Sequence, residues 1–137
     1  MRRATRAVTQ LYDDALAPSG LRTTQFALLH TLARHETMTI SALAAQMLLD
    51  RTALSRNLDP LAARDLVAIT PGSDLRTRQL SLTSAGRRAL QAAEPHWSNA
   101  QRDVSRRIGG KRLAELFSLL EDIERLHPAR PATKDPA

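Results

Sequence analysis

Over most of the chain, apolar residues recur every three or four positions, which is the spacing of amphipathic helices. Stop and cap signals mark the ends of these helices: Pro18 to Gly20 follow the first helix, and Asp50, a good N-cap residue, precedes the fourth. Thr23 or Thr24 is expected to cap the second helix, and Thr83 or Ser84 the fifth. The pattern predicts helices over residues 2–16, 24–33, 41–48, 51–65, 85–107 and 111–126.

Between the fourth and fifth helices the period changes from 3.6 to two. Val67 and Ile69 alternate with polar or small residues, and so do Leu80 and Leu82. The turn-rich stretch 71–74 lies between these two runs. The sequence therefore predicts a two-stranded β-hairpin whose tip is basic.

Three helices followed by a hairpin are the order of a winged helix. The predicted fold is mainly α: a winged helix-turn-helix with a two-stranded β wing and a helical dimerisation lobe. In such a fold the second helix of the helix-turn-helix enters the DNA major groove. Residues 1–127 are expected to form a single domain, and residues 128–137, which include three prolines, a disordered tail.

The fourth helix has a face suited to DNA. At 100° per residue, Leu54, Leu58 and Leu61 share the core side. The opposite side carries short hydroxyls and an arginine, which suit base edges and phosphates. The residues on or beside that side are Arg51, Thr52, Ser55, Arg56, Asn57 and Asp59. An ordinary surface helix would carry similar residues, and Asp59 would repel phosphates. The fourth helix alone therefore does not decide between a DNA-contacting helix and an ordinary solvent-exposed one.

Composition adds a basic charge and removes several chemistries. Twenty Lys and Arg against 14 Asp and Glu give a net charge of +6, and 18 of those cations are Arg. Arginine binds phosphates and guanine edges in a bidentate way, so a nucleic-acid partner is favoured. The absence of Cys excludes disulfides, thiolate zinc sites and thiol redox sensing.

No catalytic motif, metal-binding spacing or membrane-spanning run is found in the sequence, and residues 1–17 lack the apolar core of a secretory signal. We therefore expect a cytoplasmic, non-enzymatic protein of a bacterium or archaeon, with no cofactor, no metal and no membrane partner.

Three segments resemble a known family. Residues 50–56 read D-R-T-A-L-S-R, residues 74–86 read D-L-R-T-R-Q-L-S-L-T-S-A-G, and residues 23–32 read T-T-Q-F-A-L-L-H-T-L. Together they resemble the recognition helix, wing and second helix of the multiple-antibiotic-resistance regulator (MarR) family, and the resemblance extends over residues 2–127.

The resemblance implies an obligate homodimer that binds double-stranded DNA at a pseudo-palindromic operator and usually represses transcription. Helices at about 2–17, 85–107 and 111–126 would form the dimerisation lobe, and residues 24–83 the DNA-binding lobe. It also implies that Arg76 reaches the minor groove, with Arg78 as the other cation of the tip, and that Asp74 fixes the wing. The residues it places in the major groove are Thr52, Ser55, Arg56 and Asn57.

The chain departs from the family at two positions. Asp65 replaces the usual glycine before the wing, and Asp is one of the few residues that tolerate a positive φ there. Pro60 lies inside the predicted recognition helix and is expected to bend it or end it early.

Family members often bind small aromatic acids or other amphipathic ligands between the two lobes. The side chains that could line such a pocket, or could instead be ordinary packing residues, are Tyr12, Phe26, His30, His96 and Trp97. The main alternative function is a winged-helix module that docks a protein and does not bind DNA. An enzyme is a more distant alternative.

Overall fold

The computed structural model describes residues 1–74 and 76–127, so the predicted tail at 128–137 lies outside the described residues. The described elements, in chain order, are α1 (Arg2–Leu16), η1 (Ala17–Ser19), α2 (Thr23–Ala33), β1 (Met38–Thr39), α3 (Ile40–Gln46), α4 (Arg51–Ala63), β2 (Val67–Pro71), β3 (Arg78–Leu82), α5 (Ser84–Ile108) and α6 (Gly110–Leu126).

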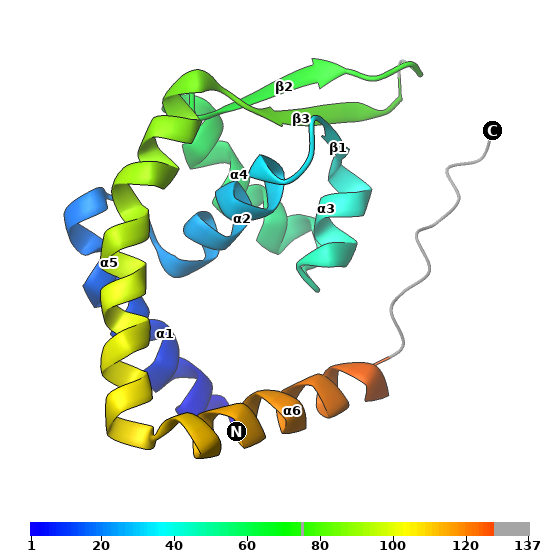
Figure 1. Ribbon diagram of the computed structural model, residues 1–137. Coiled ribbons are helices and arrows are strands. Elements are labelled where there is room, and N and C mark those ends of the chain that lie inside the picture. The colour runs from blue at the N-terminus through cyan, green and yellow to red at the C-terminus, as the bar shows by residue number, and fades with distance from the viewer. Residues whose placement is uncertain (75, 128–137) are drawn as a thin grey trace.

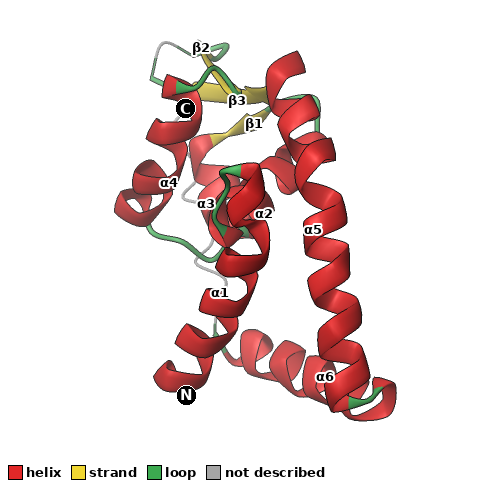
Figure 2. Cartoon of the chain, turned by 90° about the vertical axis from the view of Figure 1, so that its left-hand side faces the viewer, coloured by secondary structure: helices red, strands yellow, loops and turns green. Residues whose placement is uncertain are grey.

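The chain forms two lobes that share one long helix (Figure 1). We call residues 23–82, from α2 to β3, the winged-helix lobe, and α1, α5 and α6 the helical lobe. The sheet lies at one end of the molecule and α6 at the other, with α5 running between them, as Figure 2 also shows. This is the mainly α, winged-helix architecture that the pattern predicted.

The core of the winged-helix lobe is aliphatic. Leu29 of α2, Leu54 and Leu61 of α4, and Leu80 of β3 are all completely buried. Burying a leucine side chain contributes about 1.5–3 kcal/mol, so these contacts fix the position of α4 relative to the sheet. The three core positions predicted for α4 are confirmed, since Leu58 is buried as well.

The predicted two-stranded wing, β2 and β3, is confirmed, and a further strand extends it to a three-stranded antiparallel sheet. The strands lie in the order β1-β3-β2, and Val67 pairs with Leu82 and Ile69 with Leu80, as the alternation indicated. The additional strand, β1, pairs Met38 with Leu80. A two-residue strand has no measurable alternation, and for this reason the pattern missed it.

Helix caps follow the sequence in α4 and α5 but not in α2. Asp50 accepts the Ala53 N–H over 2.7 Å, and Thr83 Oγ1 accepts the Gly86 N–H over 2.9 Å. The predicted cap of α2 is wrong, because Arg22 holds that position and α2 begins at Thr23.

Thr23 instead connects the two lobes. Its N–H and its hydroxyl both donate to Asp13 Oδ1 of α1, each over 2.7 Å. Thr23 is the first residue inside α2, so it cannot hold the capping position that precedes the helix. The contact fixes the start of α2 against α1.

Prolines do not end the helices that contain them. Helix α4 continues past Pro60 to Ala63, and α5 continues past Pro95 to Ile108. Of the two outcomes expected of Pro60, an early end of α4 does not occur, and the next residue, Leu61, is completely buried in the core.

Helix α6 carries an apolar stripe that its own chain leaves uncovered. It leaves α5 at the Gly109 turn and extends beside the rest of the molecule (Figure 1). The side chains of the stripe remain far from buried: Leu116 is 42% exposed, Phe117 47%, Leu120 39% and Ile123 45%. On α1, Val8 and Leu11 are also exposed.

Candidate nucleic-acid interface

Helix α4 presents the polar face that the sequence assigned to it. Its N-terminal turn is fixed by the Asp50 cap, and its apolar side is anchored in the core. The side chains of Arg51, Thr52, Ser55 and Arg56 are consequently exposed on the opposite side. This arrangement leaves two guanidinium groups and two hydroxyls free to contact a ligand surface.

Asn57 is partly engaged within its own helix. Its Nδ2 donates to the Ala53 carbonyl over 2.9 Å, and its side chain is half-buried. A contact between Asn57 and a base would require this hydrogen bond to break or to be shared. Asn57 is therefore less available than its predicted partners in the major groove.

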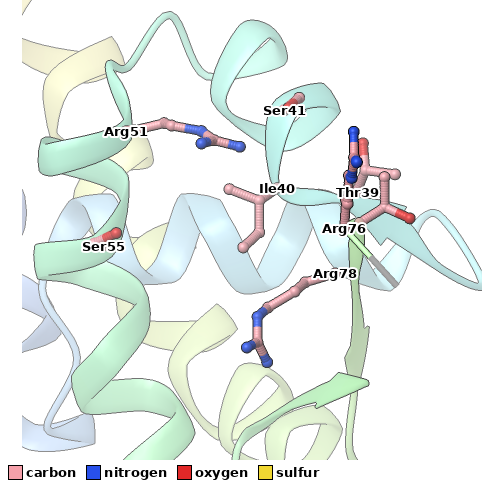
Figure 3. A pocket seen from close by; sticks show the side chains of 8 residues that line it. Thr39, Ile40, Ser41, Arg51, Ser55, Arg76 and Arg78 are labelled. Atoms are coloured by element: carbon pink, nitrogen blue, oxygen red, sulfur yellow. The ribbon is translucent and has the colours of Figure 1, made fainter. Parts of the chain in front are cut away.

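A polar cleft separates the start of α4 from the wing. Its volume is about 280 Å³, and arginines from α4 and from the wing meet there. In Figure 3 the side chains of Arg51 and Arg78 extend into the space between α4 and β3 from opposite sides. The residues lining the cleft are Thr39, Ile40, Ser41, Arg51, Ser55, Arg76, Thr77 and Arg78.

The charge of this cleft suits a polyanion. Three of its lining residues are arginines, and none is acidic. Sequence reasoning missed Thr39, Ile40 and Ser41, because they belong to the junction of the unpredicted strand β1 with α3. The Thr39 side chain caps α3 by accepting the Ala42 N–H over 3.1 Å, so this junction has a defined conformation.

Asp74 organises the described part of the wing tip. Its carboxylate accepts the Arg76 N–H over 3.2 Å, and its carbonyl accepts the Thr77 N–H over 3.0 Å and the Thr77 hydroxyl over 2.9 Å. The Gly72 N–H donates to the Thr77 carbonyl over 2.7 Å and completes the turn. Arg76 is thus carried on a hydrogen-bonded turn with its side chain exposed.

The L-T-S-A-G segment attaches the wing to α5. Thr83 Oγ1 donates to the Asp65 carbonyl over 2.6 Å, and the Thr83 N–H donates to the Leu66 carbonyl over 3.2 Å. A Cβ at Gly86 would lie 2.0 Å from the Leu66 carbonyl oxygen, so only glycine fits there. Asp65 has φ of 59°, the left-handed conformation that was expected at this position.

The structure brings together three of the five residues suggested for a ligand pocket. Phe26 of α2 stacks on Trp97 of α5 at 5.8 Å between ring centroids and on His30 at 6.1 Å. They line a cavity of about 480 Å³ between α2 and α5. Its lining residues are Thr23, Phe26, Ala27, His30, Thr31, Glu94, Trp97 and Ser98.

Tyr12 and His96 lie elsewhere. The Tyr12 hydroxyl donates to Gln101 Oε1 of α5, and burial raises the pKa of Tyr12 above its usual value of 10.0. His96 lines a separate hollow of about 390 Å³, together with Leu11 and Ala15 of α1 and Val104 of α5. Adjacent positions on a helix point about 100° apart, and so His96 and Trp97 face different hollows.

Within residues 1–74 and 76–127, no group of three or more His, Cys, Asp or Glu side chains is placed to hold a metal ion. In the same part of the chain, no helix is long and apolar enough to cross a membrane.

The chain was compared with protein families and solved structures. A sequence model described as the MarR family matches residues 19–76. The transcriptional regulator MosR of M. tuberculosis, solved in complex with DNA, is 38% identical over 92% of this chain and 94% of its own, with a TM-score of 0.78. The chain belongs to the MarR family.

Other structures place this MarR-family protein among transcriptional regulators rather than enzymes. The transcriptional repressor CouR, bound to a 23-mer DNA duplex, is 27% identical over 90% of this chain and 88% of its own, with a TM-score of 0.82. CouR from Rhodococcus jostii RHA1 was also solved with p-coumaroyl-CoA, and there the likeness is 24% identity over 95% and 88% of the chains, with a TM-score of 0.73. The comparison with curated proteins gave no match.

Proposed function

We propose that this MarR-family protein is a transcriptional repressor that binds a pseudo-palindromic DNA operator as a homodimer. The observation that carries the proposal is the arginine cleft, in which Arg51 of α4 meets Arg76 and Arg78 of the wing without an acidic lining residue. A duplex laid across it would receive α4 in the major groove and the wing tip in the adjacent minor groove.

Each element has a distinct role in this arrangement. Thr52, Ser55 and Arg56 face the base edges, while Asn57 contributes only if it gives up its bond to Ala53. Arg76 enters the minor groove, where a narrow A·T-rich segment concentrates negative potential. Arg51 and Arg78, on opposite sides of the cleft, neutralise phosphates and fix the register of the protein on the duplex.

A second copy of the chain is the partner that covers the helical lobe. The α6 stripe and the exposed Val8 and Leu11 of α1 are apolar, and a small monomer rarely leaves so many large apolar side chains in water. Obligate dimers bury more than about 2,000 Å², and three helices per chain supply an area of that order. Two-fold symmetry of the protein then matches a pseudo-palindromic operator.

Two further features complete the proposal. The cavity of Phe26, His30 and Trp97 lies between a helix of each lobe, where a small ligand could alter their relative position and thereby the affinity for DNA. The ligand-bound structure of CouR supports such a response by analogy. A repressor acts on chromosomal DNA, so the proposed location is the cytoplasm.

The decisive experiment measures binding of the purified protein to the promoter beside its own gene, at two salt concentrations. Sequence-specific binding predicts retention on the promoter fragment at the higher salt, while binding to random DNA of equal length is lost. Equal affinity for both fragments, or no binding to either, would favour the protein-docking alternative. Genome-wide mapping of bound sites then gives the operator.

A further inference from the structure

The aromatic cavity between α2 and α5 has an unbalanced charge. Glu94 is its only acidic lining residue, and none of its eight described lining residues is Arg or Lys. This is unexpected in a chain with a net charge of +6. An organic acid entering the cavity would meet the Glu94 carboxylate without a lining cation to offset the repulsion.

A second carboxylate lies just behind the cavity wall. Thr23 lines the cavity, and its N–H and hydroxyl both donate to Asp13 Oδ1. Both Thr23 donors are therefore occupied and are not offered to an anion in the cavity. Glu94 on α5 and Asp13 behind Thr23 thus place a carboxylate on two sides of the cavity.

The aromatic wall favours the same sign of charge. Phe26 and Trp97 lie nearly parallel, with 19° between their planes, and His30 continues the stack at 26° to Phe26. Aromatic faces carry the negative part of the ring quadrupole, so a cation over a tryptophan face is attracted to it. A planar ring system would extend the stack that these side chains begin.

We propose that this cavity selects planar aromatic cations and disfavours aromatic carboxylates. The inference rests on the proposed ligand response and names its chemical class. A volume of about 480 Å³ matches a ligand of one or two fused rings. The ring extends the stack at Trp97, and the positive charge lies toward Glu94 and Thr23.

Trp97 gives a direct readout, because it is the only tryptophan of the chain. Its indole N–H produces a single side-chain signal in a ¹⁵N-correlated NMR spectrum of the full-length protein. We would follow this signal at pH 8 while adding N-methylquinolinium or 2-naphthoate, two fused-ring probes of similar shape and opposite charge. The cation should bind about five to ten times more tightly, since the carboxylates are partly screened by solvent.

Two matched variants test whether the Glu94 carboxylate causes the preference for the cationic probe. Glu94→Gln should bring the affinities of the two probes within about twofold of each other. Glu115→Gln, the same change on the exposed surface of α6, should leave the preference as it is. Tighter binding of 2-naphthoate, no shift of the Trp97 signal with either probe, or a preference as large in Glu94→Gln as in the unmodified protein would each overturn the proposal.

The same samples separate this inference from the proposed function. Operator binding of the ligand-free protein is measured in parallel and does not depend on the cavity. Loss of charge selectivity with intact operator binding overturns only the ligand class. Selective binding of the cation with no effect on operator affinity supports the ligand class and overturns the proposed ligand response.

Discussion

The Thr83 hydroxyl donates to the backbone carbonyl of Asp65 over 2.6 Å and thereby joins the two ends of the β2–β3 hairpin. The same oxygen accepts the Gly86 N–H and caps α5. One side chain therefore fixes the start of the wing, its end and the beginning of the long helix. The orientation of the wing relative to α4 depends on this turn.

The turn stores backbone strain at Asp65, whose φ is 59°. Asp65→Gly should raise the free energy of unfolding by about 0.5 kcal/mol, because glycine adopts this conformation without a Cβ clash. Asp65→Val should lower it by about 1–2 kcal/mol. The control is Asp59→Gly at an exposed position of α4, which should lower the free energy of unfolding by about 0.3 kcal/mol. Urea denaturation at one protein concentration measures the free energy of unfolding of all three variants. If Asp65→Gly and Asp59→Gly change it in the same direction, Asp65 is not strained.

Gly86 of α5 lies tightly against the base of the wing. Gly86→Ala should lower the free energy of unfolding by about 3 kcal/mol or more, since its Cβ would lie 2.0 Å from the Leu66 carbonyl oxygen and 2.8 Å from Leu82 Cδ1. Gly110→Ala is the matched control, because a Cβ there meets nothing within 4 Å. Thermal unfolding should separate the two variants clearly, and similar melting temperatures would refute the contact.

Arg56 is expected to read a base. Arg56→Ala should weaken operator binding by about 1–3 kcal/mol per half-site if the guanidinium contacts guanine in a bidentate way. The loss should be larger on the operator than on random DNA, as fluorescence anisotropy can measure. Arg102→Ala, near the C-terminal end of α5 and therefore far along the helix from its junction with the wing, serves as the control and should change neither affinity. An equal loss on both DNAs would make Arg56 a phosphate contact.

The wing is tested by the salt dependence of binding. Arg76→Ala should weaken operator binding and reduce the slope of log affinity against log salt by about one unit per lost phosphate contact, up to about two per dimer. The folding temperature should change little, because the side chain is exposed. Asp74→Ala should act in the same direction but less strongly, since Asp74 contributes only the turn that carries Arg76. An unchanged affinity and slope for Arg76→Ala would show that the wing does not touch DNA.

Dimer formation is tested on the α6 stripe. Leu120→Glu should raise the dimer dissociation constant by a factor of about 100 or more, because two symmetry-related carboxylates would be buried in an apolar interface. Ser118→Glu adds the same charge to an exposed position on the opposite side of α6 and should leave the dimer intact. Light scattering at micromolar concentration distinguishes the two, and a monomeric unmodified protein would disprove the proposed dimer.

Much of the fold follows from local pattern. The core side of α4, the caps at Asp50 and Thr83, and the pairing of Val67 with Leu82 all depend on residues close in sequence or on strict alternation. The left-handed conformation of Asp65 was expected from the residue type that replaces glycine. These features are strongly determined because only one arrangement buries the apolar residues.

What the pattern missed depends on distant partners. The β1 strand exists because Met38 pairs with Leu80, 42 positions later, and two residues give no periodic signal. The cap of α2 was misplaced because the helix begins one residue earlier, at Thr23, whose N–H and hydroxyl are both bonded by Asp13 of α1. From residue type alone, Trp97 and His96 were equally good candidates for the cavity. Only the packing of α1 and α2 on α5 decides which hollow each side chain faces.

The uncovered stripe of α6 also has a genetic consequence. If the chains pair through this helix, an altered chain with a normal α6 but a defective recognition helix still forms mixed dimers with intact chains. At equal expression and random pairing, only about one quarter of the dimers would carry two working recognition helices. Alleles that damage α4 would then be dominant over the normal gene, whereas alleles that damage α6 would be recessive, because their products cannot pair.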